Sequence, residues 1–353
     1  MVATIRPAPA DSASPPLSTA LLAADVGGTH VRVGLVDPQA PATLLHYRKY
    51  ACADFPGLAE LLQAYLAGIP CAGALRRGVI ASAGHAREDG SLLSVNLPWP
   101  VEPQRLRAAL GLETLELVND FEALAHATTA PGAQVLLHLS GPSSPVPGPS
   151  LVVGPGTGLG AAVRIIGRDG RIQVLATEAG QAALGASTPL ELAVLGELLR
   201  GQRHVPLEHV LSGPGLVHLH AALARLRGQS PTQSTPDAIS AAAVAGDDAL
   251  ARDTLDLFCG LLGSTVGDLA LLYGARGGVQ LAGGILPQIR GFLAGSRFVE
   301  RFLDKGPMRE TLLRIPVTLV EHGQLGVLGA ARWYLDQLPG QAGSDRNESP
   351  PPS

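Results

Sequence analysis

The sequence contains very little lysine and cysteine, and each shortage excludes a class of protein. Lys49 and Lys305 are the only two lysines among 353 residues, and no Gly-x-x-x-x-Gly-Lys-Ser/Thr run occurs. A P-loop kinase is therefore excluded, because that motif supplies its phosphate-binding lysine. The three cysteines, Cys52, Cys71 and Cys259, lie far apart. Their odd number and wide spacing fit neither a disulfide framework nor a zinc site, so we interpret them as buried thiols and expect a cytoplasmic protein.

Charge of either sign is also scarce. Charged residues make up 16% of the chain, and 26 basic against 30 acidic side chains give a net charge of -4, which provides no basic surface for a nucleic acid. No run of 18 or more apolar residues occurs, so we expect no membrane-spanning helix. Residues 1–20 are rich in Pro, Ala and Ser without the cationic start of a signal peptide, and residues 340–353 are similar. We interpret both segments as disordered tails.

Glycine, in contrast, is concentrated in three turns that each follow a short apolar run. The turns are Asp25-Val26-Gly27-Gly28-Thr29, Gly154-Pro155-Gly156-Thr157-Gly158 and Ala282-Gly283-Gly284. Each preceding run is typical of a buried strand. Because glycine lets the backbone come close, the N–H groups of such a turn can wrap a phosphate. Most single turns of this kind are only turns, but three in this order, the first opened by an aspartate, indicate phosphate binding.

The apolar runs predict a mixed α/β protein. Strands are expected at residues 21–24, 31–36, 44–50, 78–82, 115–118, 151–153, 160–166, 171–176, 279–281 and 317–320. Helices are expected at residues 56–66, 105–110, 121–127, 190–200, 207–211, 215–227, 237–243, 247–273 and 326–335. A strand, a Gly-Thr turn and a returning strand occur twice, near residues 25 and 155, which favours two related domains facing each other. Since the first unit is a hairpin without Gly-x-Gly-x-x-Gly at a helix start, a dinucleotide-binding domain is disfavoured.

These motifs resemble those of the bacterial glucokinases of the hexokinase superfamily. Beside the turns, the resemblance rests on Val118-Asn119-Asp120-Phe121, on Glu208 with Val210-Leu211-Ser212-Gly213-Pro214-Gly215, on Ile285 after the third turn and on Asp304-Lys305-Gly306. It implies an α/β, two-domain actin-like (ribonuclease-H-like) ATPase fold with an interdomain cleft. Residues 21–130 and 322–339 would form the small domain, and residues 131–321 the large one. The sister family of sugar kinases and repressors usually carries a zinc-binding cysteine cluster, which this sequence lacks.

The resemblance also implies ATP-dependent phosphorylation of glucose at its 6-hydroxyl by a homodimer. Asp120 would be the general base, and Asn96, Asn119, Asp120, Glu178, Gln181 and Glu208 would bind the sugar. The phosphates of ATP would lie against Gly27, Gly28, Thr29, Gly156, Thr157 and Gly158, and the adenosine against Gly283 and Gly284. Asp25 would orient Mg²⁺ through water, since that ion prefers one or two carboxylates together with phosphate oxygens.

Several of these residues have a plainer interpretation. Asn119 and Asp120 are typical helix-capping residues, Glu208 could be a solvated glutamate, and Asn96 could form a turn before Pro98. The sugar motif also departs from the family, which normally has Glu-Gly-Gly-His where this chain has Glu178-Ala179-Gly180-Gln181. His30 replaces a usual asparagine and is interpreted as structural. These changes leave open an altered sugar preference, or a regulatory paralogue with little turnover.

Overall fold

The computed structural model describes residues 19–70, 72–86, 92–93, 97–128, 134–321 and 323–338. Asn96, Cys71 and most of the two expected tails lie outside these residues. Ala20, the last residue of the expected N-terminal tail, is completely buried in the core of the first sheet. The folded chain therefore begins before residue 21.

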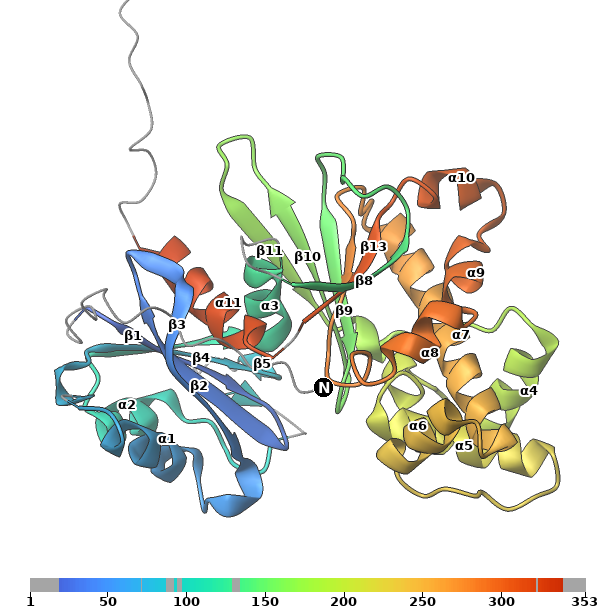
Figure 1. Cartoon of the computed structure of the whole chain (residues 1–353), viewed down its shortest axis with the longest axis horizontal. Helices are drawn as coiled ribbons and strands as arrows, with labels where there is room; N and C mark the ends of the chain where they lie inside the picture. Colours follow the sequence, from blue (N-terminus) through green and yellow to red (C-terminus); the bar gives the residue numbers. More distant parts are fainter. Residues whose placement is uncertain are drawn as a thin grey trace, which may run out of the picture.

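The first sheet has five strands in the order β3-β2-β1-β4-β7. Their bounds are β1 (Leu21–Val26), β2 (His30–Asp37), β3 (Ala40–Ala51), β4 (Arg77–Ser82) and β7 (Thr114–Asn119). β1 pairs antiparallel with β2 and parallel with β4, which pairs parallel with β7. Helices α1 (Leu58–Ala67) and α2 (Pro103–Leu110) pack together below this sheet in Figure 1. β5 (His85–Ala86) and β6 (Leu92–Leu93) form a separate small hairpin.

The second sheet repeats this topology. Its order is β11-β10-β9-β12-β13-β8. The strands are β8 (Val135–Ser140), β9 (Ser150–Pro155), β10 (Leu159–Ile166), β11 (Ile172–Thr177), β12 (Val279–Leu281) and β13 (Val317–Val320). As in the first sheet, the strand before the Gly-Thr turn pairs antiparallel with its successor and parallel with a strand that arrives after helices. The predicted duplication is therefore present in the strand order, and β8 is added at one edge.

Two helices lie between the sheets and connect them (Figure 1). α3 (Asp120–Ala127) follows the last strand of the first sheet but packs Leu124 and Ala125 against the second. α11 (Leu325–Asp336) follows the second sheet but packs against β1 and β4 of the first. A Cβ at Gly329 would stand 2.0 Å from the carbonyl oxygen of Ala123, so glycine is required where the helices cross. The Trp333 indole also donates to Glu122 at 2.8 Å.

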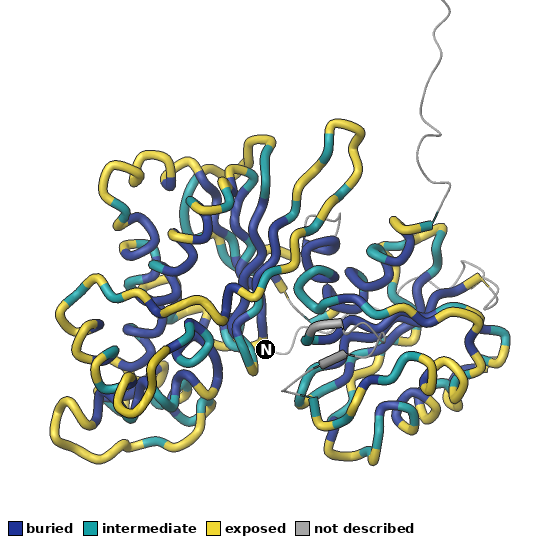
Figure 2. The backbone as a smooth tube through the Cα atoms, turned by 180° about the vertical axis from the view of Figure 1, so that it is seen from behind, coloured by how far each residue is buried: buried dark blue, intermediate teal, exposed yellow. Residues whose placement is uncertain are grey.

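The remaining helices form a layer on the second sheet. They are α4 (Pro189–Leu198), α5 (Gly213–Leu226), α6 (Pro236–Ala245), α7 (Ala249–Leu272), α8 (Arg290–Gly295), α9 (Phe298–Leu303) and α10 (Arg309–Leu312). α7 is long and apolar enough to cross a membrane by length and composition, yet 72% of its most apolar window is buried inside the protein. It is the core helix of this layer. Figure 2 shows buried backbone along the central strands of both sheets, with the exposed residues mainly on outer loops and helix faces.

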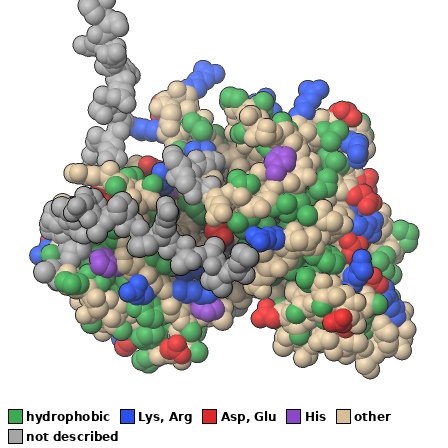
Figure 3. Space-filling view, in the orientation of Figure 1, with side chains coloured by type: hydrophobic (Ala, Val, Ile, Leu, Met, Phe, Trp, Pro, Cys, Tyr) green, Lys and Arg blue, Asp and Glu red, His purple; other side chains and the backbone are tan. Residues whose placement is uncertain are grey.

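Most expected elements are present, with boundary shifts of a few residues. The helix expected at residues 207–211 is wrong: this segment forms only a short 3-10 turn, η4 (Leu207–His209), because Ser212 already caps α5. α8, α9 and α10 were not anticipated, since each has six residues or fewer. Figure 3 shows basic and acidic side chains scattered over the face in view, as expected from the low and balanced charge.

Candidate active site

The first glycine turn connects β1 and β2 and places a buried carboxylate at its start. Asp25 is only 6% exposed, and its Oδ2 lies 3.2 Å from Nη1 of Arg32, its partner across the hairpin. Gly27 N donates to the carbonyl of His30 at 3.0 Å, which closes the turn. A Cβ at Gly326, near the start of α11, would meet the Asp25 carboxyl at 2.7 Å. The carboxylate is thus fixed by a salt bridge and by close packing.

The second turn connects β9 and β10 and is joined to the start of α5. Gly156 N donates to the carbonyl of Gly158, and Gly213 N donates to the carbonyl of Gly156, both at 2.8 Å. Gly213 is the first residue of α5, capped by the Ser212 hydroxyl, which accepts from Gly215 N at 3.0 Å. The turn therefore lies against the N-terminus of a fourteen-residue helix, where the helix dipole favours anions.

The third turn follows β12 and packs directly on the second. Gly283 has a φ of 88°, and a Cβ there would stand 2.4 Å from the carbonyl oxygen of Pro155. Ala282 N donates to the carbonyl of Val153 at 2.9 Å. Since β9 and β12 are parallel neighbours, both turns leave the sheet at the same edge. The backbone of the second and third turns thus forms one continuous surface.

Asp120 lies at the junction of β7 and α3, at the same edge of the first sheet as Asp25. β1, β4 and β7 are parallel, and their register places Val118 two strands across from Asp25. Asn119 caps α3, since its Oδ1 accepts from Phe121 N at 3.0 Å and Glu122 N at 3.1 Å. The capping interpretation therefore holds for Asn119 in this structure, where its Oδ1 is used at the helix N-terminus and its NH₂ group is not.

The protonation of Asp120 is strongly perturbed. Desolvation by burial, then repulsion from Asp25 and Glu178, raises the pKa of its carboxyl from 3.8 to about 7. The Phe121 N–H donates to its Oδ1 at 2.9 Å and opposes this rise. Asp120 is half-buried, so one side remains accessible. Such a carboxyl changes protonation near neutral pH, as a general base must.

Glu208 and Gln181 lie together beside the second turn. Glu208 Oε2 accepts from Leu159 N at 3.0 Å, and its Oε1 lies 3.5 Å from Nε2 of Gln181. The segments that carry them are paired: Leu207 N donates to the carbonyl of Ala182 at 2.8 Å. His204, which sequence reasoning missed, has its Nε2 3.0 Å from the carbonyl oxygen of Gln181. Gln181, Glu208 and His204 thus lie together on one polar surface.

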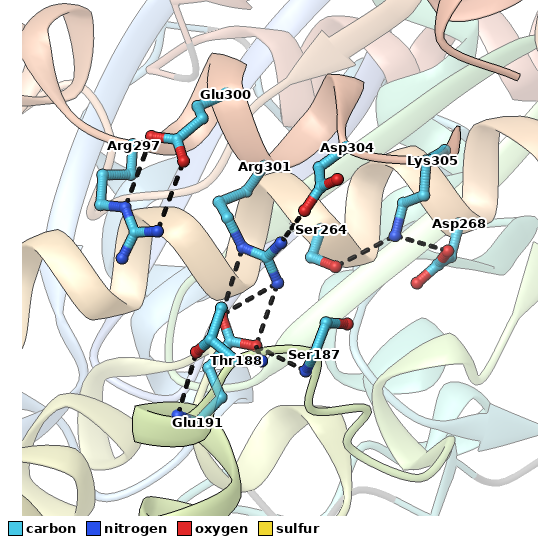
Figure 4. Close-up of polar contacts among 10 residues, drawn as sticks. All are labelled: Ser187, Thr188, Glu191, Ser264, Asp268, Arg297, Glu300, Arg301, Asp304 and Lys305. Carbon is cyan, nitrogen blue, oxygen red and sulfur yellow. Dashed lines mark hydrogen bonds and ion pairs between the residues drawn. The ribbon is translucent and has the colours of Figure 1, made fainter. Parts of the chain in front are cut away.

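The segment that follows Gln181 leads into α4, and a buried ion pair holds it there (Figure 4). Glu191, in the first turn of α4, accepts from Ser187 N at 2.7 Å and from Thr188 N at 3.1 Å. Its Oε1 also accepts from Nε and Nη2 of Arg301 at 3.2 and 3.0 Å, and both side chains are 2% exposed. Arg301 lies on α9, which packs on the glycine-containing face of α7. The pair therefore connects the segment after Gln181 to the helical core.

The expected site residues fall into three groups in space. Asp25 and Glu178 are each close enough to Asp120 to raise its pKa electrostatically. Gly156, Gly158, Gly283 and Gly284 belong to the two turns of the second sheet, and Glu208 and Gln181 lie beside them. Gly28 and exposed Thr29 belong to the first turn, and exposed Thr157 to the second. Asn96 lies outside the described residues.

This arrangement, two duplicated sheets with glycine turns at facing strand ends and a tunable carboxylate, defines a sugar kinase of the actin-like ATPase fold. The glucokinase family model matches residues 22–337, and the chain belongs to that family. A glucokinase-like protein of Xylella fastidiosa is 55% identical, covering 90% of this chain and 95% of its own. A glucokinase of Saccharophagus degradans is 36% identical, covering 90% and 98%.

Solved structures agree. A glucokinase from an Antarctic psychrotroph superposes with a TM-score of 0.76 at 34% identity, covering 89% of this chain and 98% of that one. A ROK family glucokinase from Streptomyces griseus, solved with glucose and AMPPNP, has a TM-score of 0.59 at 22% identity, covering 89% and 98%. The expected fold class and phosphotransferase class are thereby confirmed.

Proposed function

We propose that the protein is a glucokinase that transfers the γ-phosphoryl group of ATP to the 6-hydroxyl of glucose. The observation that carries this proposal is the place of the half-buried Asp120 carboxyl, at the strand edge that it shares with Asp25, where burial raises its pKa to about 7. It is supported by the family membership and by the glucose and AMPPNP bound to the Streptomyces griseus relative. ATP is the donor in this proposal.

The proposed step moves one proton and one phosphoryl group. Asp120 accepts the proton of the sugar 6-hydroxyl while that oxygen attacks the γ-phosphorus. The bond between the γ-phosphorus and the bridging oxygen breaks, and ADP leaves with that oxygen. A positioned base of this kind contributes about 10²–10⁴-fold to the rate. The carboxylates Glu178 and Glu208, with Asn119, Asn96 and Gln181, hold the sugar hydroxyls so that the 6-hydroxyl faces Asp120.

The turns hold the nucleotide in this account. Gly27, Gly28 and Thr29 approach the terminal phosphates from the first sheet, and Gly156, Thr157 and Gly158 from the second, where the N-terminus of α5 adds a positive dipole end. The adenosine lies against Gly283 and Gly284. The small domain would comprise residues 21–130 and 322–339, and the large domain residues 131–321. If the cleft between them closes, the first and second glycine turns can contact the same ATP molecule.

Asp25 suits a magnesium ion. It is a buried carboxylate at a phosphate-binding turn, and Mg²⁺ is usually held by one or two carboxylates with substrate phosphates. The ion would neutralise charge on the phosphoryl oxygens. Arg32 holds the Asp25 carboxylate in place, and Gly326 leaves it the space it occupies. We further propose a cytoplasmic homodimer.

A second candidate rests on Gln181. Because the family's histidine is absent at this position, the protein could prefer another sugar, or bind sugar with little turnover. A coupled assay for ADP release, run with glucose, mannose, fructose and N-acetylglucosamine, separates these functions. Turnover highest with glucose supports the proposal. Turnover highest with another sugar favours the altered preference, and ADP at background with all four removes the enzymatic function.

A further inference from the structure

A polar cavity lies on the first sheet, between the edge strand β3 and α1. Its volume is about 90 Å³, several times the roughly 10–15 Å³ that one water needs. His46, Arg48 and Tyr50 of β3 line one wall, and Tyr65 of α1 with Ile69 lines the other. Ala64 and Gly68, one helical turn apart, leave the space open because their side chains are small or absent.

The wall of β3 is shaped by a bulge. Val33 pairs with Arg48, but Leu35 pairs with Leu45, so β3 has one extra residue at this point. His46 lies in this bulge. Its φ of 53° makes it the one non-glycine residue with a left-handed backbone among those described. A side chain in this conformation costs free energy, and such strain is concentrated at functional sites. His46, Arg48 and Tyr50 alternate along β3 and line the cavity from one face of the strand, and the bulge lies at His46.

One of the lining residues, Tyr65, carries a buried hydroxyl that has no partner among the described residues. Tyr65 is 3% exposed, and its hydroxyl makes no hydrogen bond within the described part of the chain. Burial raises the pKa of this hydroxyl, so it stays neutral and can donate. Arg48, which lines the cavity, uses Nη1 to donate to the Tyr47 carbonyl at 3.0 Å, so its guanidinium group has further N–H groups to donate. Among the described residues, no acidic side chain lines the cavity.

We propose that this cavity is a binding site for a small oxyanion of the phosphate class, separate from the nucleotide turns. Arg48 supplies charge-assisted hydrogen bonds, the Tyr65 hydroxyl donates from the buried side, and His46 offers a ring nitrogen from the same wall as Arg48. The guanidinium group suits phosphate oxygens because its planar N–H groups match their spacing. The ligand would be inorganic phosphate itself or the phosphoryl group of a phosphate ester.

The test is thermal unfolding of the full chain in sodium phosphate and in sodium chloride of equal ionic strength. We expect phosphate to raise the Tm of the parent above its value in chloride. Arg48→Gln should weaken this phosphate response about tenfold or more in apparent Kd, and Tyr65→Phe about three- to tenfold. Arg107→Gln, an equal charge change at an exposed residue of α2, is the control and should keep the parent's response.

Tyr65→Phe removes only an unpartnered hydroxyl, so in chloride it should unfold at the parent's Tm or above. Equal phosphate responses in the parent, Arg48→Gln and Tyr65→Phe would place the anion elsewhere, for example at the nucleotide turns, and overturn the proposal. A parent response no larger in phosphate than in chloride would also overturn it. Repeating the series with a hexose phosphate shows the source of the phosphate group. A Tm rise larger than that in inorganic phosphate, and reduced in Arg48→Gln, identifies the ligand as a phosphate ester. A Tm rise equal to that in inorganic phosphate identifies it as the free ion.

Discussion

The side-chain nitrogen of Gln181 lies 3.5 Å from Oε1 of Glu208, although 27 residues separate them in the chain. The contact places the unusual glutamine beside Glu208, the glutamate for which the family resemblance implies sugar binding. A histidine here could carry charge, whereas glutamine can only donate and accept as a neutral group. We therefore propose position 181 as a residue that influences sugar preference.

Removing the Gln181 side chain should therefore weaken sugar use. We expect Gln181→Ala to raise the KM for the best sugar about three- to thirtyfold, because a neutral hydrogen bond is lost and its polar partner can be left unpaired. The KM for ATP should barely change. Gln173→Ala, at an exposed position of β11, is the matched control. Kinetics of Gln181→Ala equal to those of the parent with every sugar would remove Gln181 from the site.

The second glycine turn allows a substitution that spares the fold. Gly156 has no positive φ, and a Cβ there would meet nothing within 4 Å, so Gly156→Ala should keep the parent's Tm. The added methyl group would keep phosphates from the backbone N–H groups, and we expect the KM for ATP to rise on the order of tenfold. Gly73→Ala, equally open, is the control. An unchanged KM for ATP would show that phosphates do not approach this turn.

The buried pair of Glu191 and Arg301 should matter for stability. Glu191→Gln leaves the Arg301 charge without its bidentate partner, and losing one member of a buried pair costs about 3–5 kcal/mol. Urea unfolding measures this cost. Glu300→Gln breaks the exposed pair with Arg297 on the same helix and should cost less than about 1 kcal/mol. An equal loss of unfolding free energy in the two variants would contradict the expectation that the buried pair matters more for stability than the exposed pair.

Stability and activity should depend on pH through Asp120. Its folded pKa of about 7 lies above the ordinary 3.8, so the protonated carboxyl favours the folded state. This contribution is complete below pH 4 and is lost as the pH rises to about 7. Asp120→Asn should therefore gain stability over the parent between these values, as urea unfolding from pH 4 to 8 would show. A constant difference between the two proteins would contradict the raised pKa.

The strands flanking each glycine turn could be predicted because their apolar runs are short, continuous and bounded by glycine. β12 and β13 match the expected residues 279–281 and 317–320. The salt bridge of Arg32 with Asp25 was missed, although the two residues flank the tight glycine turn. They face each other across the hairpin that this turn closes. The Glu191–Arg301 pair could not be found from sequence, because 110 residues separate its members and only the packing of α9 on α7 brings them together.

The most direct test of the proposed function compares the parent with Asp120→Asn. Formation of glucose phosphorylated at its 6-hydroxyl is followed together with ADP release, and glucose binding is measured separately by calorimetry. The parent should form both products in equal amounts, and Asp120→Asn should bind glucose with similar affinity yet lose about 10²-fold or more in kcat. A parent that forms no phosphorylated glucose, or an Asp120→Asn variant with the parent's kcat, would contradict the account.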